Sequence, residues 1–160
     1  MPLKPPAVLL AAFSLSTAFS PGARADFNFP NFPSATGLTL VGNATVTNNL
    51  IRVTPATANQ VGAAWHTARQ NVGGGFSTTF TFRITNLSGG GADGFAFVIQ
   101  DSASNAIGLN GCRIGYHGMP RSLAVEFDTW LSTTCDAGSV NDPNDNHVSI
   151  HTRGTLPNSA

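Results

Sequence analysis

A short acidic stretch with a nearby histidine offers the clearest chemistry in this 160-residue chain. Glu126 and Asp128 stand two residues apart at the end of an apolar run that begins at Ser122, and His147 opens a second run rich in β-branched residues. Because side chains in a strand alternate between two faces, Glu126 and Asp128 point to the same face. If the two runs pair as strands, His147 joins them at the mouth of the intervening loop.

This cluster has the composition of a metal site. Two carboxylates on one strand face repel each other and lose hydration, and a bound cation removes both costs. Oxygen ligands suit calcium, and a mixed carboxylate and imidazole set suits manganese or a similar transition metal. A second interpretation is a solvated turn between two strands, with the acids facing water. The chemistry of the residues favours the metal site and leaves the second interpretation open.

The same residues resemble the metal-binding region of the legume-type (L-type) lectins. The family's motif is a strand reading V-E-F-D-T-aromatic, then a loop, then D-P-x-x-x-H and a β-branched strand. Here the first part reads Val125 to Trp130 and the second part reads Asp142 to His147. Weaker matches precede it in the family's order, and the sequence between Asn141 and Gly154 is closer to microbial members than to seed lectins.

The resemblance implies a calcium ion and a manganese or similar ion, with a role for each matching residue. Glu126 and His147 would bind the transition metal only. Asp128 and Asp142 would bridge both metals. Trp130 would offer its backbone carbonyl to calcium and its ring to the sugar.

One position departs from the family's pattern. The family usually has an asparagine two residues after the aromatic residue, where it binds calcium and donates a hydrogen bond to the sugar. This chain has Ser132 there, and Asn141 is the second candidate for the role. The resemblance leaves the choice between them open.

Two glycine-containing loops resemble the family's sugar-binding loops. The sequence Ala92-Asp93-Gly94 is similar to the A-D-G whose aspartate accepts hydrogen bonds from sugar hydroxyls, and whose preceding peptide is cis in the family. The loop 108–115 is similar to the one that donates a backbone N–H to the sugar, with Gly111 as the best candidate. Without the resemblance, both read as ordinary turns between strands.

The remaining sequence predicts an all-β fold. Short β-rich runs are separated by Gly, Asn, Thr and Ser, with no repeats and no convincing helix. Besides the two strands above, we expect an edge strand at 26–32 and strands at 38–41, 50–53, 61–65, 76–84 and 95–99. The run 95–99 is apolar on both faces and should be covered on both sides. Antiparallel strands of this kind imply two packed sheets, and the resemblance implies an incomplete legume-lectin-like (concanavalin A-like) jelly-roll β-sandwich.

The N-terminus reads as a secretory signal peptide. Lys4 precedes an apolar core at 7–19, and Ala23-Arg24-Ala25 is an A-x-A cleavage site. We therefore expect a signal peptide at 1–25 and a truncated L-type lectin domain at 26–160. The protein would be secreted, with the cell surface and the periplasm as alternative locations. We expect no membrane span in the mature chain.

Charge and cysteine content restrict the function further. Without Lys4 and Arg24, six arginines face eight acidic residues, a formal charge near −2 that argues against nucleic acid as a partner. Cys112 and Cys135 flank the key strand, and in an oxidising compartment they predict a disulfide that joins two loops. Two free or otherwise paired thiols are the alternative.

These features predict a secreted, metal-dependent carbohydrate-binding protein and not an enzyme. The partners would be glycans or glycoconjugates, with a homodimer as one option. A lectin-like glycoside hydrolase is the first alternative, but Leu131 and Ser132 stand where its second carboxylate is needed, and Glu126 is the chain's only glutamate. A structural or adhesive β-sandwich is the second alternative. His151 reads as a surface residue of its strand.

Overall fold

The structure is a computed structural model that describes residues 26–86, 90–135 and 138–152. In these ranges the chain forms nine strands and one 3-10 turn. Their bounds are β1 Leu38–Gly42, β2 Thr45–Thr47, β3 Leu50–Arg52, β4 Gly62–His66, β5 Gly94–Gln100, η1 Gly111–Arg113, β6 Ser122–Asp128, β7 Thr134–Cys135, β8 Gly138–Ser139 and β9 His147–His151. The predicted all-β fold is confirmed. The predicted signal peptide lies outside the described residues.

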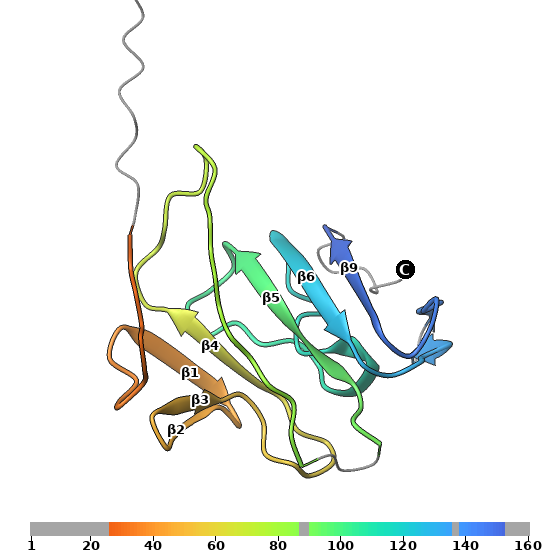
Figure 1. The fold of residues 1–160 in the computed structure, drawn as a ribbon. Coiled ribbons are helices and arrows are strands. Elements are labelled where there is room, and N and C mark those ends of the chain that lie inside the picture. The colour runs from red at the N-terminus through yellow and green to blue at the C-terminus, as the bar shows by residue number, and fades with distance from the viewer. Residues whose placement is uncertain (1–25, 87–89, 136–137, 153–160) are drawn as a thin grey trace, which may run out of the picture.

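Every strand pair in the described part of the chain is antiparallel. The largest sheet has the order β5-β6-β9, while β1 pairs with β4, β2 with β3, and β7 with β8. Figure 1 shows β5, β6 and β9 side by side, with β7 and β8 near the end of β6. Asp128 lies opposite Gly94 on one side and opposite His147 on the other. The predicted pairing of the two strands that carry the acidic cluster is thus confirmed.

One face of this sheet is covered by aromatic rings. Phe95 of β5 and Phe127 of β6 stack with centroids 4.7 Å apart. Phe82 lies 4.4 Å from Phe95 and Phe80 lies 5.6 Å from Phe97, so the segment before β5 packs across these strands. Figure 1 shows this yellow-green segment running past β5. Large aromatic side chains supply most of the apolar burial on this face.

The opposite face of the sheet is covered by the loop between β5 and β6. Tyr116 and Met119 of this loop are buried against Ala124 of β6, with Val98 of β5 packed beside them. The Trp65 side chain of β4 donates a 2.7 Å hydrogen bond to a carbonyl of the same loop. The prediction that the strand at 95–99 is covered on both sides is therefore confirmed, and the loop reaches the face that carries Glu126.

Two predicted strands are wrong. Residues 26–32 join none of the sheets formed by the described residues, because Pro30 has no N–H to donate and the rings pack instead, with Phe27 stacked 4.3 Å from His66. Residues 76–84 alternate as expected, and their phenylalanines face the sheet, but they have no ladder partner among the described residues. Phe80 and Phe82 consequently stay 44% and 49% exposed. The short strands β2, β7 and β8 were not predicted.

The stacked phenylalanines should dominate the stability of the β5-β6-β9 sheet. Phe127→Ala removes a ring that contacts Phe80, Phe82 and Phe95, and we expect it to lower the free energy of unfolding by about 3–5 kcal/mol. The matched control, Phe27→Ala, removes a ring that is 51% exposed and should cost less than about 1 kcal/mol. Urea unfolding measures both, and equal losses would contradict this description of the core.

Candidate functional site

The acidic cluster forms at the end of β6, where this strand lies between β5 and β9. Each of Glu126, Asp128 and His147 offers one ligand atom, and these atoms all lie within 4.8 Å of one another. The Glu126 and Asp128 residues are only 1% and 3% exposed. The alternative interpretation, a solvated turn whose acids face water, does not agree with this burial of Glu126 and Asp128.

His147 has a ring orientation that suits metal binding. Its Nδ1 lies 3.2 Å from the carbonyl oxygen of Asn144, which can only accept, so a hydrogen bond there requires a proton on Nδ1. With Nδ1 directed at this carbonyl, the other ring nitrogen, Nε2, faces the cluster and lies 4.0 Å from Oδ1 of Asp142. This arrangement, with one ring nitrogen donating to a carbonyl, is typical of histidine ligands.

Asp142 joins the cluster from the loop before β9. Its Oδ2 accepts a 2.7 Å hydrogen bond from the backbone N–H of Ser132, and its side chain is 1% exposed. Ser132 itself is buried, whereas Asn141 is exposed and has a positive φ of 55°. The structure thus places both candidates for the family's asparagine role, Ser132 and Asn141, beside Asp142.

The electrostatics of the cluster fit a bound divalent cation. Burial, together with the nearby Asp142 and Glu126 carboxylates, raises the pKa of Asp128 to about 6, against the opposing effects of the Trp130 backbone N–H and of His147. A cation reverses this balance because it favours the ionised carboxylates. Three carboxylates with one imidazole are a donor set that suits manganese and, through the oxygens, calcium.

The predicted sugar-binding aspartate lies beside this cluster. The Ala92–Asp93 peptide is cis, as the resemblance implies. The Asp93 carbonyl accepts a 2.9 Å hydrogen bond from the N–H of Thr129, and the Thr129 hydroxyl donates to the Gly91 carbonyl at 2.7 Å. Burial raises the pKa of Asp93 above its ordinary value. The loop is therefore attached to the residue that directly follows Asp128.

Trp130 is attached to the same cluster through its backbone and is itself exposed. Its backbone N–H donates a 2.7 Å hydrogen bond to Oδ1 of Asp128, while the residue is 43% exposed. The ring lies against Gly90, where an added Cβ would come within 2.9 Å of a ring carbon. The ring is thus held by a glycine on one side and remains accessible to a ligand.

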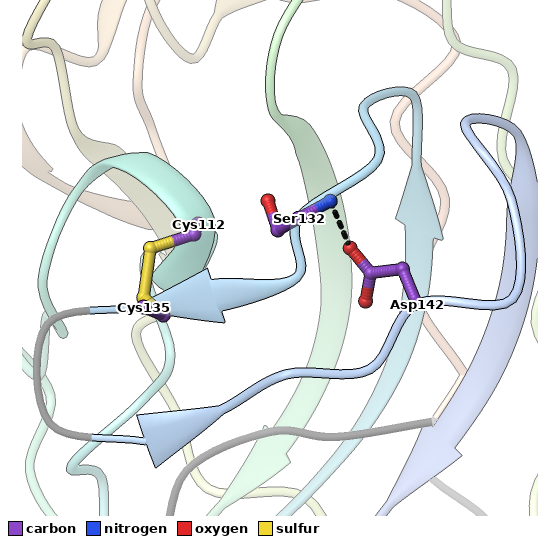
Figure 2. The surroundings of a disulfide bond; sticks show 4 residues. All are labelled: Cys112, Ser132, Cys135 and Asp142. Atoms are coloured by element: carbon purple, nitrogen blue, oxygen red, sulfur yellow. Dashed lines mark hydrogen bonds between the residues drawn. A yellow bond between two sulfur atoms is a disulfide. The ribbon is translucent and has the colours of Figure 1, made fainter.

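The second predicted sugar-binding loop, 108–115, is covalently attached to the segment that follows β6. Cys112 and Cys135 form the predicted disulfide, with Cα atoms 6.0 Å apart, so this prediction is confirmed. Figure 2 shows the bond close to Ser132 and Asp142. Gly111 begins η1, directly before Cys112, and has a φ of 66° with open space around its Cα. The disulfide therefore joins the Gly111 loop to the segment that enters the acidic cluster.

Sequence reasoning misplaced one residue of this region and missed another. His151, predicted on the surface, is only 6% exposed and points its Nε2 toward Glu126, at 3.8 Å from Oε2. Its position on the same strand face as His147 was a usable signal. Tyr116 was missed, although its buried hydroxyl donates a hydrogen bond to Oε2 of Glu126. It comes from an irregular loop, where no periodicity indicates which way a side chain points.

Comparison with known proteins identifies the class of this fold and site. A family model described as the legume lectin beta-barrel domain matches residues 28–159. The chain therefore belongs to the L-type lectin family.

Individual relatives agree with this assignment. A lectin from Bauhinia forficata is 33% identical over 127 residues, which are 67% of this chain and 52% of that protein. The L-type lectin-domain containing receptor kinase IV.2 of Arabidopsis thaliana is 35% identical over 149 residues, 81% of this chain and 21% of that protein. The chain thus spans about half or less of the length of these relatives. Both are plant proteins, and a microbial origin stays a prediction.

A solved structure shows the same fold. The lectin from Bauhinia forficata in complex with GalNAc superimposes with a TM-score of 0.57 at 23% identity, over 82% of this chain and 61% of that one.

The described part of this chain contains no helix long and apolar enough to cross a membrane.

The disulfide should stabilise the fold by closing the loop around β6. The cysteines are 23 residues apart, and closing a loop of this length in the unfolded chain is worth about 3 kcal/mol. We expect the Cys112→Ser/Cys135→Ser double variant to lose about that much free energy of unfolding. Adding dithiothreitol in urea titrations should then destabilise the unmodified protein and leave the variant unchanged. If dithiothreitol destabilised the variant as well, its effect would not come from reduction of the Cys112–Cys135 disulfide.

Proposed function

We propose that this protein is a lectin that binds glycans non-covalently, through loops whose positions depend on bound calcium and manganese or a similar transition metal. The observation that carries the proposal is the attachment of the Asp93 loop and of Trp130 to one buried acidic cluster. The Thr129 N–H donates to Asp93, and the Trp130 N–H donates to Asp128. Membership of the L-type lectin family supports the same function.

The metal part of the proposal assigns ligands to each ion by resemblance and by position. Glu126 and His147 would bind the transition metal, and Asp128 and Asp142 would contact both ions. The Trp130 carbonyl, with Ser132 or Asn141, would complete the calcium site. When bound, the ions would neutralise the buried carboxylates and oppose the pKa rise of Asp128.

Sugar binding would use groups from three loops. The Asp93 carboxylate would accept hydrogen bonds from sugar hydroxyls, a backbone N–H at Gly111 would donate one, and the exposed Trp130 ring would cover an apolar sugar face. Asn141 would donate a further bond if it, and not Ser132, takes the family's asparagine role. Each hydrogen bond exchanged with water gains only about 1 kcal/mol, so affinity depends on groups that are fixed in advance.

The proposed ligands are glycans or glycoconjugates, and a glycan array would identify the sugar. Because single-site binding of this kind is weak, repeated ligands or a homodimer would supply avidity. A secreted location fits the predicted signal peptide and the Cys112–Cys135 disulfide.

Removal of the metals should both destabilise the protein and abolish glycan binding. Because a ligand at about 100 times its Kd adds about 2.7 kcal/mol, EDTA should lower the melting temperature by about 10 °C. Calcium plus manganese should restore both the melting temperature and the signals on a glycan array. Indifference to EDTA in both assays would contradict metal dependence, and hydrolysis of the glycans would favour the glycoside hydrolase alternative.

The Asp93 carboxylate should determine sugar binding without determining metal binding. Asp93→Asn replaces the carboxyl acceptor by an amide, and we expect glycan affinity to fall by about 10- to 100-fold while the response to EDTA persists. Asp101→Asn is the matched control, because Asp101 lies on another loop in an exposed pair with Arg69 and should leave affinity within about twofold. Equal affinities of the two variants would place the sugar elsewhere.

A further inference from the structure

A buried polar network lies beside the acidic cluster on the same face of the β5-β6-β9 sheet. Its members are Tyr116 from the loop before β6, Glu126 of β6, and Ser149 and His151 of β9. We call this group the Tyr116 network. Asp128 and His147 lie on its other side, since the register places Asp128 opposite His147 and Glu126 opposite Ser149. Glu126 therefore belongs to both groups.

Tyr116 contacts Glu126 through a hydrogen bond that is almost fully removed from water. The two residues are 6% and 1% exposed, and the tyrosine hydroxyl donates to Oε2. A tyrosine hydroxyl is a hydrogen-bond donor and a carboxylate oxygen can only accept, so the direction of this bond is fixed. A charge-assisted hydrogen bond of this type offsets part of the cost of burying the carboxylate.

His151 approaches the same carboxylate oxygen from β9. Its Nε2 lies 3.8 Å from Oε2 of Glu126 and 2.7 Å from the hydroxyl of Ser149. Its ring lies 6.1 Å from that of Tyr116, with 30° between the planes. The His151 backbone lies opposite Ala124 in the sheet, and its ring nitrogen contacts the Ser149 hydroxyl, so the histidine is held at both its backbone and its ring.

We propose that Tyr116 and His151 are positioning residues that fix the Glu126 carboxylate toward Asp128 and His147, and so favour the transition metal in the candidate site. This inference rests on the metal part of the proposed function. A glutamate side chain has three rotatable bonds, and a partner on one oxygen restricts how the other end of the carboxylate can turn. Partners of this kind commonly change metal affinity by about 10- to 100-fold when they are removed.

The effect should be selective between the two metals. Glu126 is expected to bind the transition metal only, whereas Asp128 and Asp142 are expected to contact both. Loss of the Tyr116 hydroxyl should therefore weaken manganese binding more than calcium binding. A purely structural role would instead lower stability with no change in the ratio of the two affinities.

The test measures manganese and calcium binding to the whole protein by isothermal titration calorimetry. Tyr116→Phe keeps the ring and removes only the donor, and we expect the manganese Kd to rise about 10-fold and the calcium Kd to change less than about threefold. Ser122→Ala is the matched control, because it removes a hydroxyl from the far end of β6 that donates to the Met119 carbonyl. It should change both Kd values less than about twofold.

A second variant and a second readout keep the test decisive. His151→Asn should raise the manganese Kd by only about threefold. The effect is smaller than for Tyr116→Phe because the His151 ring nitrogen is beyond hydrogen-bond distance of Glu126. The melting temperature without metal reports any general loss of stability separately. If the unmodified protein binds manganese and Tyr116→Phe binds it equally well, the inference is wrong and the proposed function survives. If the unmodified protein binds neither metal, the metal part of the proposed function and this inference both fail.

Discussion

The burial of negative charge at the end of β6 is the constraint on which the site depends. Glu126 and Asp128 are almost fully buried, and Asp142 approaches them from another loop. Buried like charges are costly unless hydrogen bonds or a cation compensate for them. The chain supplies backbone donors to two of the carboxylates and a tyrosine hydroxyl to the third. These donors orient the carboxylates but leave their charges close together, which is the condition that favours a bound cation.

This single cluster also organises segments that lie far apart in the sequence. The hydrogen bond from Thr129 attaches the Asp93 loop to the end of β6, and the disulfide from Cys112 attaches the Gly111 loop to β7. Behind the cluster, the phenylalanine face holds β5 and β6 together. A rigid sheet therefore presents irregular loops whose ends are fixed, and this is the arrangement that weak, hydrogen-bonded ligands such as sugars require.

The sequence predicted those parts of the structure that follow from alternation or from a motif. The period of two in β6 placed Glu126 and Asp128 on one face, and the hypothesis that the two runs pair as strands added His147 to them, as the register shows. Alternation could not decide whether 76–84 finds a ladder partner, because pairing depends on other strands. It also predicted an edge strand at 26–32, where Pro30 and ring packing prevent one. Tyr116 could not be predicted, since its direction is set by an irregular loop.

Anomalous diffraction at the manganese edge, from crystals of the protein grown with calcium and manganese, tests the central claim most directly. We predict one strong peak among Glu126, Asp128, Asp142 and His147, at about 2.0–2.3 Å from their ligand atoms, in keeping with metal–nitrogen and metal–oxygen distances. A well-ordered cluster of the same four residues with no peak, or a peak bound only elsewhere on the protein, would contradict the claim that buried charge here serves a metal.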